Sequence, residues 1–202
     1  MSHVSYIGTC MDAVPRLNLG PRWTTANDED RFADAFVEAY DGKYPWLHSG
    51  SPKLNRIMAR EVPVNGFGIA DLVAVSWDIE TAAWPMEPLA AEVRPTVRAF
   101  EFKLSDWRKG LMQAHRYRFF ADVAILVLPT AKLAVAQPYL PTFRKLNVGL
   151  WGFNEVTGAI TTALTPRPRL PADRGHRERA IARVLNTTRH AKPQACPSVM
   201  SN

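Results

Sequence analysis

The sequence predicts an α/β protein with a mixed central β-sheet flanked by helices on both faces. Short apolar runs typical of buried strands alternate with segments whose apolar residues recur at helical spacing. A strand–helix–strand unit over 97–104, 107–121 and 123–128 predicts a parallel strand pair with a right-handed crossover. Two earlier strands joined by a short turn add an antiparallel pair, so strands of both orientations are expected in one sheet.

Residues 1–26 are expected to form an irregular N-terminal arm, because prolines and a glycine interrupt them and no hydrophobic period is sustained. A helix is expected to follow, with Asn27 as its N-cap and acidic residues in its first turn, where the helix dipole favours negative charge. Its apolar residues recur at helical spacing as far as Tyr40, and Asp41-Gly42 is expected to end the helix.

Two strands are expected over 54–64 and 68–77, joined by a tight turn at Asn65-Gly66. The second strand is an apolar run that is broken by a single carboxylate, Asp71. The connection over 78–95 contains three prolines, which favours an excursion over the surface.

The strand over 97–104 carries an acid and an ammonium two positions apart within an apolar run. Because side chains alternate along a strand, Glu101 and Lys103 are expected to point to one side, and Phe100 and Phe102 to the other side, into the core. A charged pair beside a buried sheet costs free energy unless it is paired or used. This strand is therefore the first candidate for a functional site.

The second half of the chain is expected to alternate between helices and strands, as the change from helical spacing to short apolar runs indicates. No internal repeat is apparent. The expected elements are a helix over 107–121 capped by Ser105 or Asp106, a fully buried strand over 123–128, a short helix over 138–146, a strand pair over 148–153 and 159–164, and an amphipathic helix over 174–188.

The composition is that of a soluble globular protein, with 47% hydrophobic and 22% charged residues. No apolar stretch approaches the roughly 20 residues that a membrane span requires, and the N-terminus lacks the pattern of a secretory signal. The two cysteines, Cys10 and Cys196, lie near opposite ends of the chain, which argues against a disulfide framework or a zinc site. We therefore expect a cytoplasmic protein.

The net charge of +6 is concentrated at the C-terminal end. Residues 165–202 contain eight Lys and Arg against two acidic residues, so residues 1–164 are balanced in charge. A neutral body with a basic end is typical of a protein with an anionic partner such as nucleic acid. A solvated tail that aids solubility explains the charge equally well.

Three motifs stand in a fixed order along the chain. Asp71 lies on one strand, Glu101-Phe102-Lys103 lies on a later strand, and Gln113 and Tyr117 follow four residues apart on the next helix. This order resembles the PD-(D/E)xK nuclease superfamily, which has the restriction-endonuclease-like fold, and in particular its branch with a Gln-x-x-x-Tyr motif.

The resemblance covers most of the expected folded part of the chain. It departs at Ala70, where the name-giving proline would stand, but that position is loose in the superfamily. The predicted division is an irregular arm over 1–26, a nuclease-like core over 27–165, a basic C-terminal helix over 166–190 and a disordered tail over 191–202.

The carboxylates of Asp71 and Glu101 are hard oxygen ligands that suit Mg²⁺, which needs few such ligands because it keeps several waters. A bound metal would lower the pKa of a water and offset charge on the scissile phosphate. We expect Lys103 to orient that water and stabilise charge. The resemblance implies Mg²⁺, with Mn²⁺ as a substitute, and adds the Phe102 carbonyl and Glu29 of the first helix as ligands. A structural salt-bridge cluster is the alternative.

The helix after the Glu-x-Lys strand supplies the remaining candidates. Gln113 and Tyr117 lie one turn apart and share a face with Lys109, which suits contact with a DNA backbone or support of the metal site. Ordinary polarity of a helix surface is the alternative. The predicted catalytic set is Asp71, Glu101, Lys103 and Gln113, and the predicted DNA contacts are Lys109, Arg116, Tyr117 and Arg177.

The sequence therefore predicts a Mg²⁺-dependent nuclease that hydrolyses DNA phosphodiester bonds and has no membrane partner. The alternative is a non-catalytic nucleic-acid-binding or assembly subunit that retains the nuclease fold. Cleavage of both DNA strands needs two active sites, which favours a homodimer, and a separate targeting protein is the other arrangement consistent with the sequence.

Overall fold

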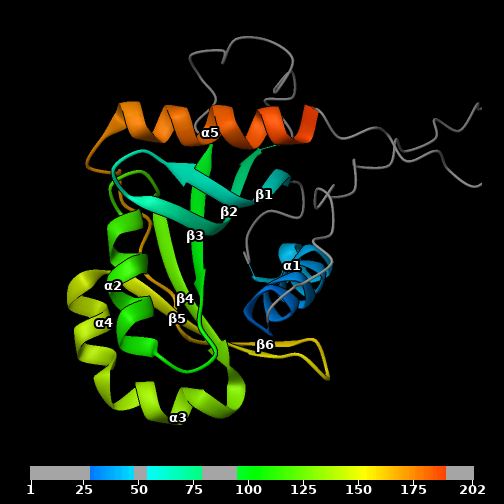
Figure 1. Cartoon of the computed structure of the whole chain (residues 1–202), viewed down its shortest axis with the longest axis vertical. Helices are drawn as coiled ribbons and strands as arrows, with labels where there is room; N and C mark the ends of the chain where they lie inside the picture. The colour runs from blue at the N-terminus through cyan, green and yellow to red at the C-terminus, as the bar shows by residue number, and fades with distance from the viewer. Residues whose placement is uncertain (1–27, 48–53, 79–94, 190–202) are drawn as a thin grey trace, which may run out of the picture.

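The structure, a computed structural model, describes residues 28–47, 54–78 and 95–189 (Figure 1). The expected N-terminal arm, the Asn27 cap, most of the 78–95 connection and the C-terminal tail lie outside these ranges. The strands are β1 (Leu54–Val64), β2 (Gly68–Asp78), β3 (Thr96–Phe102), β4 (Val123–Pro129), β5 (Val148–Asn154) and β6 (Ala159–Leu164). The helices are α1 (Asp28–Leu47), α2 (Trp107–Tyr117), η2 (Thr130–Lys132), α3 (Leu133–Ala136), η3 (Gln137–Tyr139), α4 (Leu140–Leu146) and α5 (Arg174–Arg189).

The six strands form one mixed sheet in the order β1-β2-β3-β4-β5-β6. β1, β2 and β3 pair antiparallel, β3, β4 and β5 pair parallel, and β6 returns antiparallel to β5. The parallel pair β3–β4 is joined through α2, which is the predicted strand–helix–strand unit. The predicted mixed α/β class is therefore confirmed.

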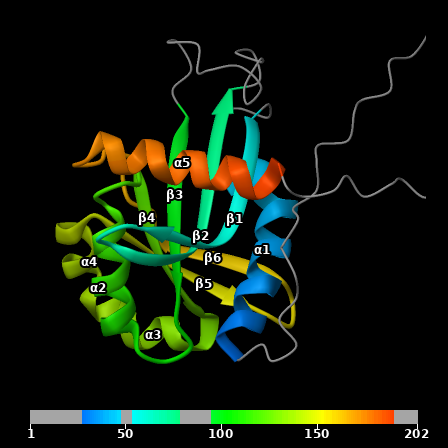
Figure 2. The same ribbon diagram turned by 45° about the horizontal axis from the view of Figure 1, so that its top comes forward.

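Helices cover both faces of this sheet. On one face, the rings of Phe32 and Phe36 on α1 pack edge-on against Phe102 of β3, with centroids 6.2 and 5.1 Å apart. On the other face, α5 crosses β1 to β3 and buries Ile181 in the same cluster as Ala99 (Figure 2). The alternation of side chains along β3 thus sends its aromatic residues to α1 and its small ones to α5.

The first helix is longer than predicted, because it continues past Gly42 to Leu47. An isolated glycine inside a helix costs only about 1 kcal/mol relative to alanine. Pro45 has no N–H to donate to the Asp41 carbonyl four residues earlier. Arg56 of β1 donates to that carbonyl instead, at 2.7 Å, and its Nε donates to Oδ1 of Asp41 at 2.7 Å. A tertiary contact therefore replaces the donor that the helix lacks.

The second helix is shorter than predicted, because it ends at Tyr117 rather than at residue 121. Its N-cap is Asp106, one of the two expected candidates, whose Oδ1 accepts from the Lys109 N–H at 3.0 Å. After Tyr117 the chain turns, and the Asp122 carboxylate accepts from the Val97 N–H at 2.7 Å. This contact holds residue 122 beside the start of β3. A helix that continued to residue 121 would not bring the chain to this position.

The expected short helix over 138–146 begins earlier, as a run of short helical pieces from Thr130 to Leu146. Leu133, Ala136 and Phe143 are the buried residues of this run, and they pack in one cluster with Leu111 of α2. Proline at 138 and at 141 removes backbone donors, which explains why the run is divided into short pieces. The helices around β4 and β5 therefore form a separate part of the core.

Smaller differences concern the ends of elements. β3 ends at Phe102 rather than at residue 104, and the turn between β1 and β2 spans residues 65–67. The C-terminal helix begins at Arg174, and residues 166–173 lead to it without a regular element. None of the described helices is long and apolar enough to cross a membrane.

Candidate active site

Asp71 and Glu101 lie on neighbouring strands at the end of the β2–β3 ladder. The last pair of this antiparallel ladder joins Leu72 to Phe100, so the next positions, 71 and 101, face each other. There the Asp71 side chain takes the place of a backbone acceptor, because its Oδ2 accepts from the Phe102 N–H at 2.8 Å. The two predicted carboxylates therefore meet, as the sequence indicated.

Glu101 is a fully buried carboxyl group, with 0% of its side chain exposed. Its Oε2 is hydrogen-bonded to the Tyr117 hydroxyl of α2, and its Oε1 lies 3.0 Å from Nζ of Lys103. Burial and then the charge of Asp71 raise the pKa of Glu101 to about 7. This carboxyl group thus changes its protonation state near neutral pH.

The neighbouring Asp71 is affected in the same direction. Burial raises the pKa of Asp71 above its usual value, although the hydrogen bond from the Phe102 N–H and the charge of Lys103 oppose the shift. Two adjacent carboxylates that both resist ionisation form a site where a cation is favoured.

Lys103 lies just past the end of β3, and its ammonium group is surrounded by oxygen atoms. Nζ lies 3.0 Å from Oε1 of Glu101, 3.3 Å from Oε2 of Glu29 and 2.7 Å from the carbonyl of Phe102. Burial alone would lower the pKa of Lys103, but the carboxylates around it outweigh burial and raise the pKa above its usual value. Lys103 is therefore a fixed positive charge in this arrangement.

The helix α2 carries two more predicted residues, and it brings Tyr117 to the site. Tyr117 is 2% exposed, and its hydroxyl lies 2.8 Å from the Ile69 carbonyl as well as against Glu101. Gln113, one turn earlier on the same face, has a buried Oε1 with no hydrogen-bond partner among the described residues. Of the two predicted roles for Tyr117, this placement favours support of the acidic site.

Two residues that the sequence did not single out position this cluster. Arg60 of β1 donates from Nε to the Asp71 carbonyl at 3.0 Å and pairs with Asp34 and Asp30 of α1. Gly110 of α2 lies so close to β4 and to the residue after β3 that a Cβ atom there would stand 2.6 Å from Cδ1 of Leu126 and 2.8 Å from Cγ of Lys103. The sequence did contain a signal for Gly110, because a glycine inside a helix that follows the Glu-x-Lys strand usually has a packing reason.

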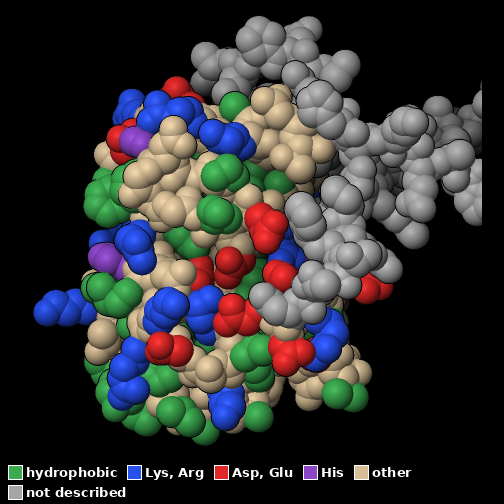
Figure 3. All heavy atoms as spheres, in the orientation of Figure 1, with side chains coloured by type: hydrophobic (Ala, Val, Ile, Leu, Met, Phe, Trp, Pro, Cys, Tyr) green, Lys and Arg blue, Asp and Glu red, His purple; other side chains and the backbone are tan. Residues whose placement is uncertain are grey.

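The electrostatic balance of this network is negative, and Figure 3 shows acidic side chains gathered near the middle of this face of the molecule. Such an excess of carboxylates favours a divalent cation over a neutral ligand. The network joins five carboxyl groups, from Glu29, Asp30, Asp34, Asp71 and Glu101, through two cations, Lys103 and Arg60.

The donor atoms at the site fit a hard cation. Oε1 of Glu101 meets Lys103 as an ion pair but accepts no well-aligned hydrogen bond, so it keeps lone pairs for a ligand. The Lys103 ammonium already sits among two carboxylates and a carbonyl, the atoms that Mg²⁺ prefers. Within the described ranges, no set of three or more His, Cys, Asp and Glu residues is arranged to hold a metal. Mg²⁺ is commonly bound by one or two carboxylates.

The remaining predicted residues lie at different distances from the cluster. Glu29 in the first turn of α1, which the resemblance implied as a ligand, lies 3.3 Å from Lys103. Lys109 and Arg116 are exposed on α2. Arg177 lies elsewhere, near the start of β3, where it pairs with Asp122 at 3.1 Å. The guanidinium of Arg177 is therefore occupied within the fold.

Comparisons with known proteins identify no family for this chain. No protein-family model matches the sequence, and no curated protein matches it. The candidate site therefore depends on the residues and contacts of this chain alone.

Proposed function

We propose that this protein is a Mg²⁺-dependent nuclease that hydrolyses DNA phosphodiester bonds at the Asp71–Glu101–Lys103 cluster. The observation that carries the proposal is that the buried carboxyl group of Glu101, the partly buried carboxylate of Asp71 and the ammonium group of Lys103 meet where β2 and the end of β3 pair. A salt bridge whose role was only to stabilise the fold would need one carboxylate for each ammonium or guanidinium group. Here an excess of acid surrounds the base.

Asp71 and Glu101 would hold the metal, with the Phe102 carbonyl and Glu29 as further oxygen donors and Mn²⁺ as a substitute ion. When bound, the ion would supply a water of lowered pKa and positive charge beside the scissile phosphate. The oxygen ligands are held in position by other residues of the chain. Arg60 donates to the backbone carbonyl of Asp71, and the Phe102 N–H donates to the Asp71 carboxylate. Orientation of ligands by such outer contacts is what a precise site requires.

Lys103 acts in this proposal as an electrostatic group rather than as a base. Its raised pKa keeps the ammonium protonated at neutral pH, so it donates hydrogen bonds to a water or to a phosphate oxygen. Charge that develops on the phosphate is stabilised by a cation already in place. The shared contacts with Glu29 and Glu101 hold that cation at the site before substrate arrives.

Gln113 and Tyr117 support the cluster from α2. The Tyr117 hydroxyl fixes one oxygen of Glu101 and leaves the other directed toward Lys103. The buried amide oxygen of Gln113 accepts from a water or a substrate group that enters the site. We propose DNA as the partner and the cytoplasm as the compartment. A second copy of the chain in a homodimer would cut the second DNA strand, or a separate targeting protein would direct the nuclease to its site on DNA.

The test is cleavage of plasmid and oligonucleotide DNA in Mg²⁺ or Mn²⁺. Asp71→Asn and Lys103→Ala are expected to lose about 100-fold or more of the activity, because each removes a group that acts on the reacting atoms. Glu38→Gln on α1 and Lys145→Ala on α4 are the matched controls, since both side chains are exposed. These controls are expected to keep wild-type activity.

Cleavage that persists in both site variants would reject the proposal. DNA binding without cleavage in either metal would favour the alternative, a non-catalytic nucleic-acid-binding subunit that retains the fold.

A further inference from the structure

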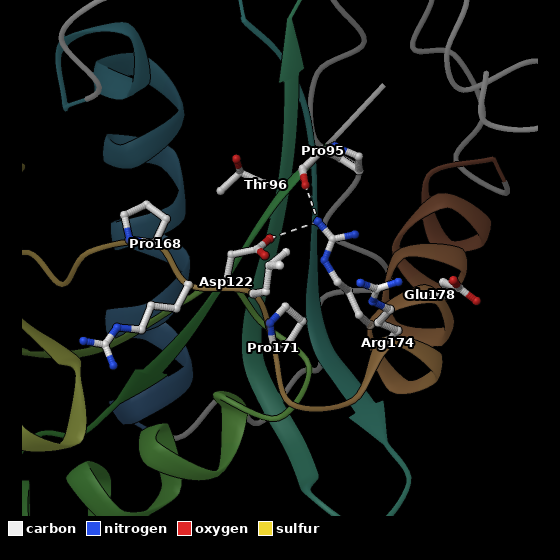
Figure 4. Close-up of a pocket in the computed structure, with 10 residues that line it drawn as sticks. Pro95, Thr96, Asp122, Pro168, Pro171, Arg174 and Glu178 are labelled. Atoms are coloured by element: carbon white, nitrogen blue, oxygen red, sulfur yellow. Dashed lines mark hydrogen bonds and ion pairs between the residues drawn. The ribbon is translucent and has the colours of Figure 1, made fainter. Parts of the chain in front are cut away.

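A cavity of about 390 Å³ lies between the start of β3, residues 168–171 and the first two turns of α5 (Figure 4). Thr96, the first residue of β3, lines it, whereas Glu101 lies five residues further along the strand. At about 3.3 Å per residue, the cavity and the acidic cluster are roughly 17 Å apart along β3. The cavity is therefore separate from the candidate active site.

One ion pair in the cavity wall is satisfied within the fold. Oδ2 of Asp122 accepts from the Val97 N–H at 2.7 Å and pairs with Arg177 at 3.1 Å. Arg177 also donates to the Pro95 carbonyl (Figure 4). This pair joins α5 to the start of β3, and its charges cancel, so it offers little to a ligand.

Two other arginines of the wall have no such partner. The guanidinium groups of Arg169 and Arg174 are exposed and make no hydrogen bond or ion pair with any residue that the structure describes. Glu178 is the remaining carboxylate among the described lining residues. The wall thus keeps an excess of positive charge after its internal pair is removed from the balance.

A neighbouring arginine adds to this excess. Arg118 donates to the Asp122 carbonyl at 3.1 Å, so it lies behind the same wall. Burial and then the charge of Arg169 lower the pKa of Arg118, which means that the two guanidinium groups lie close enough to repel each other. An anion between or beside them would relieve that repulsion.

We propose that this cavity binds a phosphate group of the nucleic acid substrate, held by the guanidinium groups of Arg169 and Arg174. Guanidinium groups match the geometry of phosphate oxygens. The volume admits a phosphate together with its sugar. The inference depends on the proposed function in one respect, that the phosphate belongs to a nucleic acid.

The experiment measures binding of a short fluorescein-labelled DNA duplex to the full chain by fluorescence anisotropy, in EDTA and over a series of salt concentrations. Arg169→Ala/Arg174→Ala is compared with Arg167→Ala/Arg179→Ala, which removes two exposed arginines of the same segment outside the cavity. Arg177 is left intact because its ion pair is structural. Thermal unfolding verifies that both double variants fold.

The cavity variant is expected to bind about 10-fold more weakly and to show a salt slope smaller by about 2, because two phosphate contacts are lost. The control variant is expected to bind within about 2-fold of wild type. Equal affinities of the two variants, or no DNA binding by the wild-type chain, would overturn the inference. So would a loss of deoxyadenosine monophosphate binding with duplex binding at the control level, which would assign the cavity to a free nucleotide.

Because EDTA removes divalent metal, this result does not depend on cleavage. A chain that binds DNA through Arg169 and Arg174 but cuts it in no metal would keep this inference and reject the proposed function.

Discussion

The hydroxyl of Tyr117 and the carboxyl of Glu101 form a hydrogen bond, and the protonation state of Glu101 decides which of the two groups donates. The Tyr117 oxygen lies within reach of Oε2 of Glu101 and also 2.8 Å from the Ile69 carbonyl, yet a phenol has one hydrogen to donate. When Glu101 is protonated, its O–H donates to Tyr117, and Tyr117 donates to Ile69. When Glu101 is ionised, Tyr117 can satisfy only one of the two acceptors. Burial and the charge of Asp71 raise the pKa of Glu101 to about 7, although the hydrogen bond with Tyr117 opposes this rise.

The first prediction concerns stability against pH in the absence of metal. The pKa of Glu101 is raised from 4.5 to about 7 in the folded chain, so the folded state holds more protons than the unfolded state between these values. The free energy of unfolding should therefore fall as the pH rises from about 4.5 to 7, by up to about 3 kcal/mol from this group. Asp71, whose pKa is also raised, adds in the same direction. Urea unfolding in EDTA across this range measures the slope.

Glu101→Gln provides the control for that slope. Its amide donates to Tyr117 without titrating, so the variant should be at least as stable as wild type at pH 8 and should lose most of the pH dependence. Addition of Mg²⁺ should restore stability to the wild type at pH 8, because a ligand that binds only the folded state stabilises it, and should stabilise the variant less at the same Mg²⁺ concentration. An unchanged slope in the variant would contradict the assignment of the proton to Glu101.

The second prediction concerns Arg60, which joins α1 to the backbone of Asp71. Arg60→Ala should lower the free energy of unfolding by about 1–3 kcal/mol, since it leaves partly buried acceptors without their donor. The matched control is Arg31→Ala, because Arg31 is 65% exposed and pairs only at the surface with Asp28 and Glu155. Its loss should cost less than about 1 kcal/mol. Equal losses in the two variants would show that the Arg60 contacts contribute no more than a surface pair.

The third prediction concerns the close approach of α2 to β4 and to Lys103 at Gly110. A Cβ atom there would lie 2.6 Å from Cδ1 of Leu126 and 2.8 Å from Cγ of Lys103. Gly110→Ala should therefore destabilise the chain by about 1–3 kcal/mol and displace Lys103. Gly42→Ala is the control, because no atom of the residues that the structure describes lies within 4 Å of its Cβ position, and alanine favours a helix by up to about 1 kcal/mol. Thermal unfolding should show opposite shifts, and a stabilised Gly110→Ala variant would contradict the packing described.

Much of the candidate site follows from local rules in the sequence. Strand alternation predicts that Glu101 and Lys103 lie on one side, and although β3 ends at Phe102 their charged groups lie 3.0 Å apart. The antiparallel pairing of β2 with β3 then brings Asp71 beside them. Helical spacing places Gln113 and Tyr117 on one face of α2. These predictions hold because each needs only the period of one element and the pairing of its neighbours.

Other features depend on contacts between distant segments, which the local pattern does not contain. The extension of α1 past Gly42 depends on Arg56 of β1 replacing the donor that Pro45 lacks. A count of charges treats all C-terminal arginines alike, whereas Arg177 is paired with Asp122. The role of Gly110 depends on the distance between a helix and a strand. Such distances are set by packing, not by spacing along the chain.

The most direct measurement is a titration of the full chain with Mn²⁺, followed by electron paramagnetic resonance, at pH 8 where Glu101 is ionised. We predict a site whose affinity falls about 10-fold or more in Asp71→Asn and in Glu101→Gln and stays unchanged in the exposed control Glu38→Gln. Equal Mn²⁺ affinity in all four proteins, or no binding by the wild type, would contradict the assignment of Asp71 and Glu101 as ligands of one divalent ion.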